Sequence, residues 1–169
     1  MKQINCNLIV VGVVRNCEKT IISDYKKIKN SFSTFNNILF YLVESDSNDS
    51  TIEKLNIIKS LDKNFNYHSL GKLRDKIPNR SERIAFCRNN YVKYILDGYN
   101  QYFSPYILVS DFDGINNKLS KASAESCFLR DDWDVCSSNQ AGPYFDIWAL
   151  RHKVWCPEDC WANYAELIG

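Results

Sequence analysis

The segment Asp111-Phe112-Asp113-Gly114 carries two carboxylates two residues apart and follows the apolar run at 106–110. In extended backbone, residues two apart point to the same side, so both carboxylates can face one ion while Phe112 turns toward the core. Carboxylate oxygens suit Mg2+ or Mn2+, and such an ion can also bind the oxygens of a diphosphate. Because isolated Asp-x-Asp triplets also occur by chance in solvated turns, the elements around this one decide its meaning.

Strand and helix patterns alternate along the chain up to this segment. Short apolar runs predict strands, and apolar residues at helical spacing predict helices between them. The alternation indicates an α/β fold with a parallel sheet, in which ligands bind outside the carboxyl ends of the strands. Strands are expected at 9–14, 38–43, 66–70 and 106–110, and helices from a Thr20 cap to residue 32, over 51–61, and from Ser81 to a breaker at Gly98. Two further strands, at 133–138 and 145–151, predict a mixed edge of the sheet.

The composition is that of an ordinary globular protein of one domain. The chain has 169 residues, of which 45% are hydrophobic and 24% are charged. With 21 basic and 20 acidic residues, the net charge of +1 provides no long-range field to concentrate a nucleic acid. We therefore expect one core, one site and no nucleic-acid partner.

The apolar segments and the cysteines indicate where in the cell the protein is expected. The apolar run at 8–14 is far shorter than the roughly 20 residues of a membrane span, so we expect no integral membrane segment. The seven cysteines are an odd number in a chain large enough to build a core, which favours reduced thiols and a cytoplasmic location. Cys156 and Cys160 have no second ligand pair for zinc, and His68 and His152 have no ligand-spaced partner.

Four segments, in their order along the chain, carry a family resemblance. They read VVGVVRN at 10–16, ESDSNDST at 44–51, RIAFCRN at 83–89 and YFDIWALR at 144–151. With the Asp-x-Asp strand, they make nearly the whole chain resemble a GT-A type nucleotide-sugar glycosyltransferase. The segment at 144–151 is similar to capsule-associated mannosyltransferases and related proteins.

The resemblance implies a fold, an activity and a cofactor. The fold would be the GT-A (Rossmann-like) three-layer sandwich, with residues 1–169 as a single domain. The activity would be metal-dependent transfer of a sugar from a nucleoside diphosphate sugar to a hydroxyl acceptor on a glycan or glycoconjugate. Asp111 and Asp113 would hold Mn2+ or Mg2+, and Asp111 would also contact the donor.

The resemblance also assigns donor-binding residues. Arg15 would lie near the donor phosphates or base, Glu44 and Asp46 near the nucleoside, and Arg83 and Arg88 near the diphosphate or the sugar. The alternatives are a solvated loop charge for Arg15, helix capping for Glu44 and Asp46, and surface ion pairs for the two helical arginines.

Candidate residues for the acceptor side lie near the end of the sequence. Asp146 is expected to face the cleft and orient acceptor or donor hydroxyl groups, with Trp148 on the same face to stack on a sugar or to pack in the core. Glu158 and Asp159 resemble the acidic pair that supplies the general base in inverting enzymes. If the enzyme retains configuration, as the mannosyltransferase resemblance suggests, the pair is only a helix start after Pro157.

Two other interpretations stay open. One is an inactive nucleotide- or glycan-binding module of the same fold, and another is a nucleotidyltransferase, although no phosphate-cradling Gly-rich loop is present. Many GT-A enzymes are longer, so the chain could be compact, a fragment, or part of a homo-oligomer that completes its site with another subunit.

Overall fold

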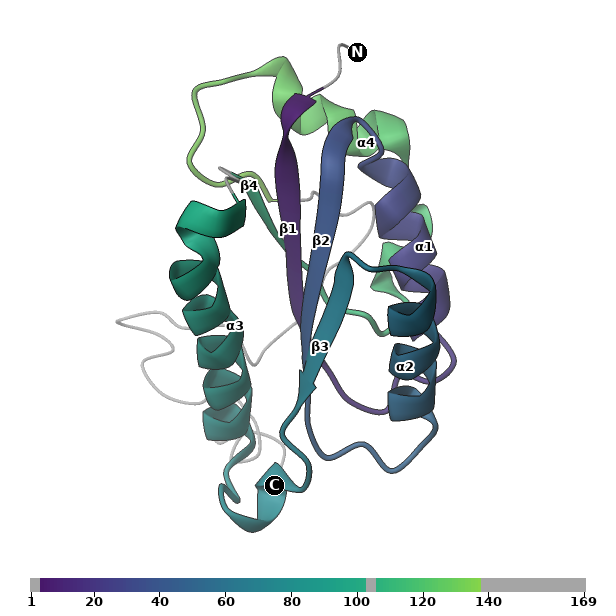
Figure 1. Cartoon of the computed structure of the whole chain (residues 1–169), viewed down its shortest axis with the longest axis vertical. Helices are drawn as coiled ribbons and strands as arrows, with labels where there is room; N and C mark the ends of the chain where they lie inside the picture. Colours follow the sequence, from purple (N-terminus) through teal and green to yellow (C-terminus); the bar gives the residue numbers. More distant parts are fainter. Residues whose placement is uncertain (1–3, 103–105, 138–169) are drawn as a thin grey trace, which may run out of the picture. The chain divides into compact units, whose positions relative to one another are not determined.

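The computed structural model describes residues 4–102 and 106–137, and their strands form one parallel sheet (Figure 1). The order across the sheet is β3-β2-β1-β4, and every neighbouring pair is parallel. The expected α/β fold with a parallel sheet is therefore confirmed for this part of the chain. The strands are β1 (Ile4–Val14), β2 (Phe35–Glu44), β3 (Phe65–Ser69) and β4 (Tyr106–Val109).

Helices cover both faces of the sheet (Figure 1). The crossover helices α1 and α2 lie on one face together with α4, and α3, which leads from β3 to β4, lies on the other. The bounds are α1 (Ile21–Ser31), α2 (Thr51–Leu61), α3 (Arg80–Tyr102) and α4 (Lys121–Ser126), with short 3-10 turns at Leu73–Asp75, Ile115–Lys118 and Cys127–Leu129.

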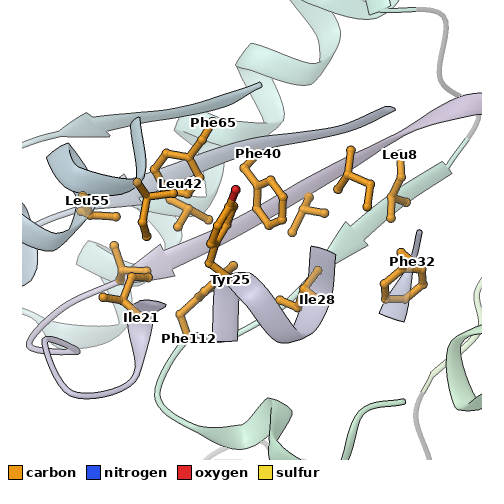
Figure 2. Packing of buried hydrophobic residues seen from close by; sticks show 14 of the residues in the cluster. Leu8, Ile21, Tyr25, Ile28, Phe32, Phe40, Leu42, Leu55, Phe65 and Phe112 are labelled. Carbon is orange, nitrogen blue, oxygen red and sulfur yellow. The ribbon is translucent and has the colours of Figure 1, made fainter. Parts of the chain in front are cut away.

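Alternate residues of β1 enter two separate hydrophobic clusters. Leu8 and Val10 belong to the cluster beneath α1 and α2, whereas Ile9 and Val11 belong to the cluster that includes Cys87 and Tyr91 of α3. Figure 2 shows the first cluster, in which Tyr25 of α1 meets Phe40 and Phe65 of the sheet. A strand buried on both faces explains why β1 reads as an unbroken apolar run.

The structure corrects two expected elements. The helix expected to stop near Gly98 continues to Tyr102, because one buried glycine costs a helix only about 1 kcal/mol relative to alanine and does not end it. The strand expected at 133–138 is absent from its described residues, 133–137. Asp132 and Asp134 disfavour a strand there, and Val135 is 85% exposed.

The chain separates into two units, Met1–Asp131 and Asp132–Gly169. The first contains all four described strands and all four α-helices. The expected strand at 145–151 lies outside the described residues, so the mixed edge and the single-domain expectation stay predictions. Within 4–102 and 106–137, no helix is both long enough and apolar enough to cross a membrane.

Candidate functional site

The strand β4 approaches β1 closely where it ends. The backbone N–H of Ser110 donates to the carbonyl of Val11 at 3.0 Å. A Cβ placed on Gly12 would lie 2.3 Å from the Ser110 carbonyl oxygen and 3.0 Å from the Phe112 ring. Only glycine therefore fits opposite the chain as it leaves β4 toward the two aspartates.

The segment after β4 separates its side chains as the sequence indicated. Phe112 is 2% exposed and belongs to the core beneath α1, where it is labelled in Figure 2. Asp111 and Asp113, on either side of it, are both exposed. The burial of Phe112 thus fixes the segment while leaving two carboxylates accessible.

Two residues at the start of helix α1, its N-cap Thr20 and Asp24 in its first turn, hold the turn 111–114 by hydrogen bonds. The Thr20 hydroxyl donates to the Phe112 carbonyl at 2.8 Å, and the Gly114 N–H donates to the Asp24 carboxylate at 2.8 Å. Asp24 is 1% exposed, and Gly114 has a φ of 97°, a left-handed conformation that favours glycine. Thr20 stands at the expected cap position, but its hydroxyl makes no capping bond and serves this turn instead.

A second anchor comes from the 3-10 turn that follows. The Asn116 side-chain amide donates to the Asp111 carbonyl at 2.7 Å, and its oxygen accepts from the Ser110 hydroxyl at 3.1 Å. Asn116 therefore holds the Asp111 carbonyl and the Ser110 side chain, and the Ser110 N–H is held by Val11, which restricts where the Asp111 carboxylate can go.

Charged groups converge on Asp111. Partial loss of hydration raises the pKa of its carboxyl, the negative charge of Asp113 raises it further, and Arg88 of α3 acts in the opposite direction. The net result is a raised pKa for Asp111. Three of the predicted site residues therefore lie close enough together for the charges of Asp113 and Arg88 to act on Asp111.

This group lies at a switch in the topology. From β1 the chain crosses to β2 and then β3 on one side, whereas β4 is on the other side of β1. The order of the strands reverses between β1 and β4, and such a switch point is where open parallel sheets bind ligands at the carboxyl ends of their strands.

The loops that follow β1 and β2 are joined to each other. Backbone N–H groups of one loop donate to side chains of the other, as from Cys17 to Thr51 at 2.8 Å, from Glu18 to Asp49 at 3.1 Å and from Asn48 to Asn16 at 2.8 Å. Arg15 is exposed, and its Nε donates to the Asp46 carbonyl at 3.3 Å. The acidic turn at 44–51 is therefore one rigid piece with the loop that carries Arg15.

Glu44, predicted to lie near the nucleoside, is engaged within the fold. It is 1% exposed, and its carboxylate accepts from the Ser47 N–H at 3.0 Å and from the Ser69 hydroxyl. The carboxylate holds the start of the acidic turn against the end of β3. It does not cap α2, and Ser50, which stands at the N-cap position before that helix, makes no side-chain capping bond either.

Asp46 and Arg83, both predicted donor contacts, pair with each other. The Arg83 Nε lies 3.6 Å from the Asp46 carboxylate, and the two side chains are 9% and 7% exposed. Asp46 also accepts from the Arg74 N–H at 2.8 Å, and Arg83 donates to the Ile77 carbonyl at 2.8 Å and to that of Pro78. The pair is buried, so it differs from the surface pair considered for Arg83, and a role in donor binding stays a prediction.

The remaining predicted residues, Asp146, Glu158 and Asp159, lie outside the described residues, as does Trp148. Sequence reasoning missed the role of three residues that hold the turn with the aspartates: Thr20, Asp24 and Asn116. Asp24 reads as an ordinary acid in the first turn of a helix, and nothing in the sequence pairs it with Gly114, 90 residues away.

No family model matches the chain, and no curated protein matches it significantly. The function is therefore inferred from the residues of the chain and the geometry of the site.

Proposed function

We propose that the protein is a metal-dependent glycosyltransferase that moves a sugar from a nucleoside diphosphate sugar to a hydroxyl acceptor. The observation that supports this most is the pair of exposed carboxylates, Asp111 and Asp113, anchored at the switch point of a parallel sheet beside Arg88. The resemblance of the sequence to GT-A enzymes supports the same interpretation.

The pair suits a hard divalent cation such as Mn2+ or Mg2+. Among the described residues no group of three or more His, Cys, Asp or Glu side chains could hold a metal. Two carboxylates match a cation that takes its other ligands from water and substrate phosphates, as Mg2+ commonly does. When bound, the cation would neutralise charge on the leaving diphosphate.

The like charges of Asp111 and Asp113 support the cation further. The negative charge of Asp113 disfavours the ionised form of Asp111, which contributes to the raised pKa of Asp111. A cation shared by the two would remove this repulsion. Arg88, whose charge acts on Asp111 in the opposite direction, would offer a positive charge to the phosphates without competing for the metal.

Two measurements test the proposal: binding of nucleoside diphosphates, and then turnover of the sugar donor. We expect nucleoside diphosphates with Mn2+ to raise the melting temperature, since ligand at about 100 times its Kd adds about 2.7 kcal/mol. Asp111→Asn and Asp113→Asn should each lose this shift. Asp97→Asn is the matched control, because Asp97 is exposed on the last turns of α3, which lead into the amino end of β4, whereas the two aspartates follow its carboxyl end.

Manganese-dependent hydrolysis of the sugar donor separates an enzyme from a binding module. A shift that persists in both aspartate variants, or no shift in the native chain at millimolar ligand, would contradict the proposal. The acceptor side is assigned to Asp146, Glu158 and Asp159, whose substitution should lower transfer to the acceptor more than donor binding.

A further inference from the structure

The loop between β3 and α3 presents three basic side chains to solvent. Lys72, Arg74 and Lys76 are all exposed, and within the described part of the chain none of their side chains makes a hydrogen bond or an ion pair. With Asp75 between them, the segment 72–76 carries three positive charges and one negative charge in a chain whose net charge is +1. The positive charge is therefore concentrated locally, and the three cations are available to an anionic ligand.

The fold holds this loop in place. The Leu73 side chain is 5% exposed and belongs to the hydrophobic cluster beneath α3, and Ile77 packs against the same cluster. The backbone N–H of Arg74 donates to the Asp46 carboxylate at 2.8 Å, and the Arg83 guanidinium donates to the Ile77 carbonyl at 2.8 Å. Because its apolar residues pack inward and its backbone is bound at both places, the loop presents its basic side chains from a fixed base.

The loop leaves the sheet at the same edge as the two aspartates. Since β3 and β4 are parallel to the other strands, their carboxyl ends meet at one edge, where the loop follows β3 (Figure 1) and the turn 111–114 follows β4. These are the outer strands of the four, so three strand spacings, about 14 Å, separate them. A ligand that contacts both places must extend along this edge, as a glycan chain can.

We propose that Lys72, Arg74 and Lys76 bind acidic groups of the acceptor, and that the acceptor is therefore an acidic glycan. This inference rests on the proposed function, which requires a hydroxyl acceptor. Guanidinium and ammonium groups form charge-assisted hydrogen bonds with carboxylate and phosphate groups, which are stronger than those with neutral hydroxyl groups. The loop holds the charged part of the glycan, and the hydroxyl to be glycosylated reaches the donor at the two aspartates.

A membrane surface fits the loop less well than a glycan does. The apolar residues Leu73 and Ile77 pack into or against the core, so they are not available to enter a bilayer. Each basic residue near an anionic surface strengthens binding about fivefold, so three of them give a binding constant of about 100 M−1. A single myristoyl chain reaches about 10,000 M−1 and is already a marginal anchor. The same gain is useful for an acceptor that also contacts the site of transfer, because the two contacts then reinforce each other.

The test removes the three charges from the full chain. Fluorescence anisotropy with labelled oligogalacturonate, which carries a carboxylate on each sugar, compares the native protein with the triple variant Lys72→Gln, Arg74→Gln and Lys76→Gln. We expect native binding that salt weakens, and a Kd at least about tenfold higher in the variant. Uncharged maltose oligomers should not compete. The melting temperature should be kept, because the backbone hydrogen bond from Arg74 to Asp46 stays in the variant.

The matched control removes the same amount of charge elsewhere. In this variant glutamine replaces three other exposed lysines, Lys26, Lys63 and Lys93, and the Kd should stay close to the native value. An equal rise of the Kd in both triple variants would overturn the inference, because net charge alone would then explain the binding. A native protein that binds no oligogalacturonate would overturn it as well.

Two further ligands separate a glycan from other acidic partners. Phosphatidylglycerol vesicles represent a membrane, and polyglutamate represents an acidic protein segment. Binding of either that is stronger than that of oligogalacturonate, and that is lost in the loop variant, would overturn the assignment to a glycan.

The proposed function is tested separately by the thermal shift with Mn2+ and nucleoside diphosphate. The loop variant should keep this shift, and its loss would overturn the inference, because the three bases would then serve the donor. A native protein that shows the shift but does not bind oligogalacturonate overturns the inference alone. A native protein without the shift overturns the proposed function itself.

Discussion

Asp111 and Asp113 depend on the residue between them. Phe112 is buried in the core, and this turns the two carboxylates outward from a segment whose backbone is held by Thr20, Asp24 and Asn116. A preorganised pair of like charges binds a cation better than a mobile pair, because the conformational entropy has already been lost on folding. At the level of single residues, the site is thus a rigid anionic turn with one arginine beside it.

Cys17, at the start of the loop after β1, should be unreactive in the folded protein. Burial raises the pKa of its thiol to about 11, so about one thiol in a thousand is ionised at pH 8. We expect mass spectrometry after brief treatment with iodoacetamide at pH 8 to find Cys17 unmodified and the exposed Cys136 alkylated. In urea both should react. Rapid native alkylation of Cys17 would show that the loop after β1 opens readily.

Among the strands and helices, the close approach of β1 to the end of β4 positions the site. Gly12 admits the Ser110 carbonyl, and β4 is followed directly by the turn 111–114. Helix α1 then fixes this turn through two hydrogen bonds from its first turns. The placement of the carboxylates therefore depends on β1, α1 and β4 together.

Gly12→Ala tests this dependence. Its Cβ would lie 2.3 Å from the backbone oxygen of Ser110, so β4 must shift, and we expect a loss of at least about 2 kcal/mol in the free energy of unfolding by urea. The thermal shift with Mn2+ and nucleoside diphosphate should fall as well.

Gly71→Ala provides the comparison for Gly12→Ala. Gly71 has a φ of 62°, and no atom lies within 4 Å of the Cβ that alanine would add, so the change should cost only backbone strain of about 1–2 kcal/mol. Ligand binding should be kept. A Gly12→Ala protein as stable as the native chain, with unchanged ligand binding, would contradict the close approach.

Local patterns were sufficient to predict most elements, but not where all of them end. The apolar run at 9–14 marked the second half of β1, yet the strand begins at Ile4, because the polar Asn5 and Asn7 face asparagines of β2. Such cross-strand pairs depend on a partner about 30 residues away. The same limit applies to the site: the Asp-x-Asp spacing indicated the carboxylates, whereas the pairing of Asp46 with Arg83 is non-local.

In the first unit, a polar cluster around the buried Asp62 joins the two crossover helices of one face. Tyr25 and Lys29 of α1 both donate to the carboxylate of Asp62, just after α2, at 2.6 Å. The same Asp62 accepts from the Asn64 N–H at 2.9 Å in the turn before β3. This cluster fixes α1, which in turn holds the turn 111–114.

Acid should weaken this cluster. Burial acts to raise the pKa of Asp62, but the hydrogen bonds from Lys29, Tyr25 and Asn64 outweigh it and hold the pKa below its ordinary value of 3.8. A depressed carboxyl pKa contributes stability above that value and loses it as the pH falls through the folded-state pKa. The contribution of Asp62 should therefore be complete at pH 7 and reduced near pH 3.

Urea unfolding of Asp62→Asn measures that contribution. We expect the variant to be less stable by about 1–3 kcal/mol at pH 7, with a smaller difference at pH 3. Glu53→Gln, at an exposed position on α2, is the control and should show little difference at either pH. A difference that stays constant between pH 7 and pH 3 would show that the ionised carboxylate is not what stabilises the cluster.

Electron paramagnetic resonance of Mn2+ shows whether Asp111 and Asp113 hold a cation, because the signal of the free aqueous ion falls when the ion is bound. With GDP or UDP present, we expect the native protein to bind about one Mn2+ beyond what the nucleotide alone accounts for. Asp111→Asn and Asp113→Asn should each abolish this binding, and Asp97→Asn should retain it. Equal Mn2+ binding by all four proteins, or none by the native chain, would contradict the assignment of Asp111 and Asp113 as the metal site.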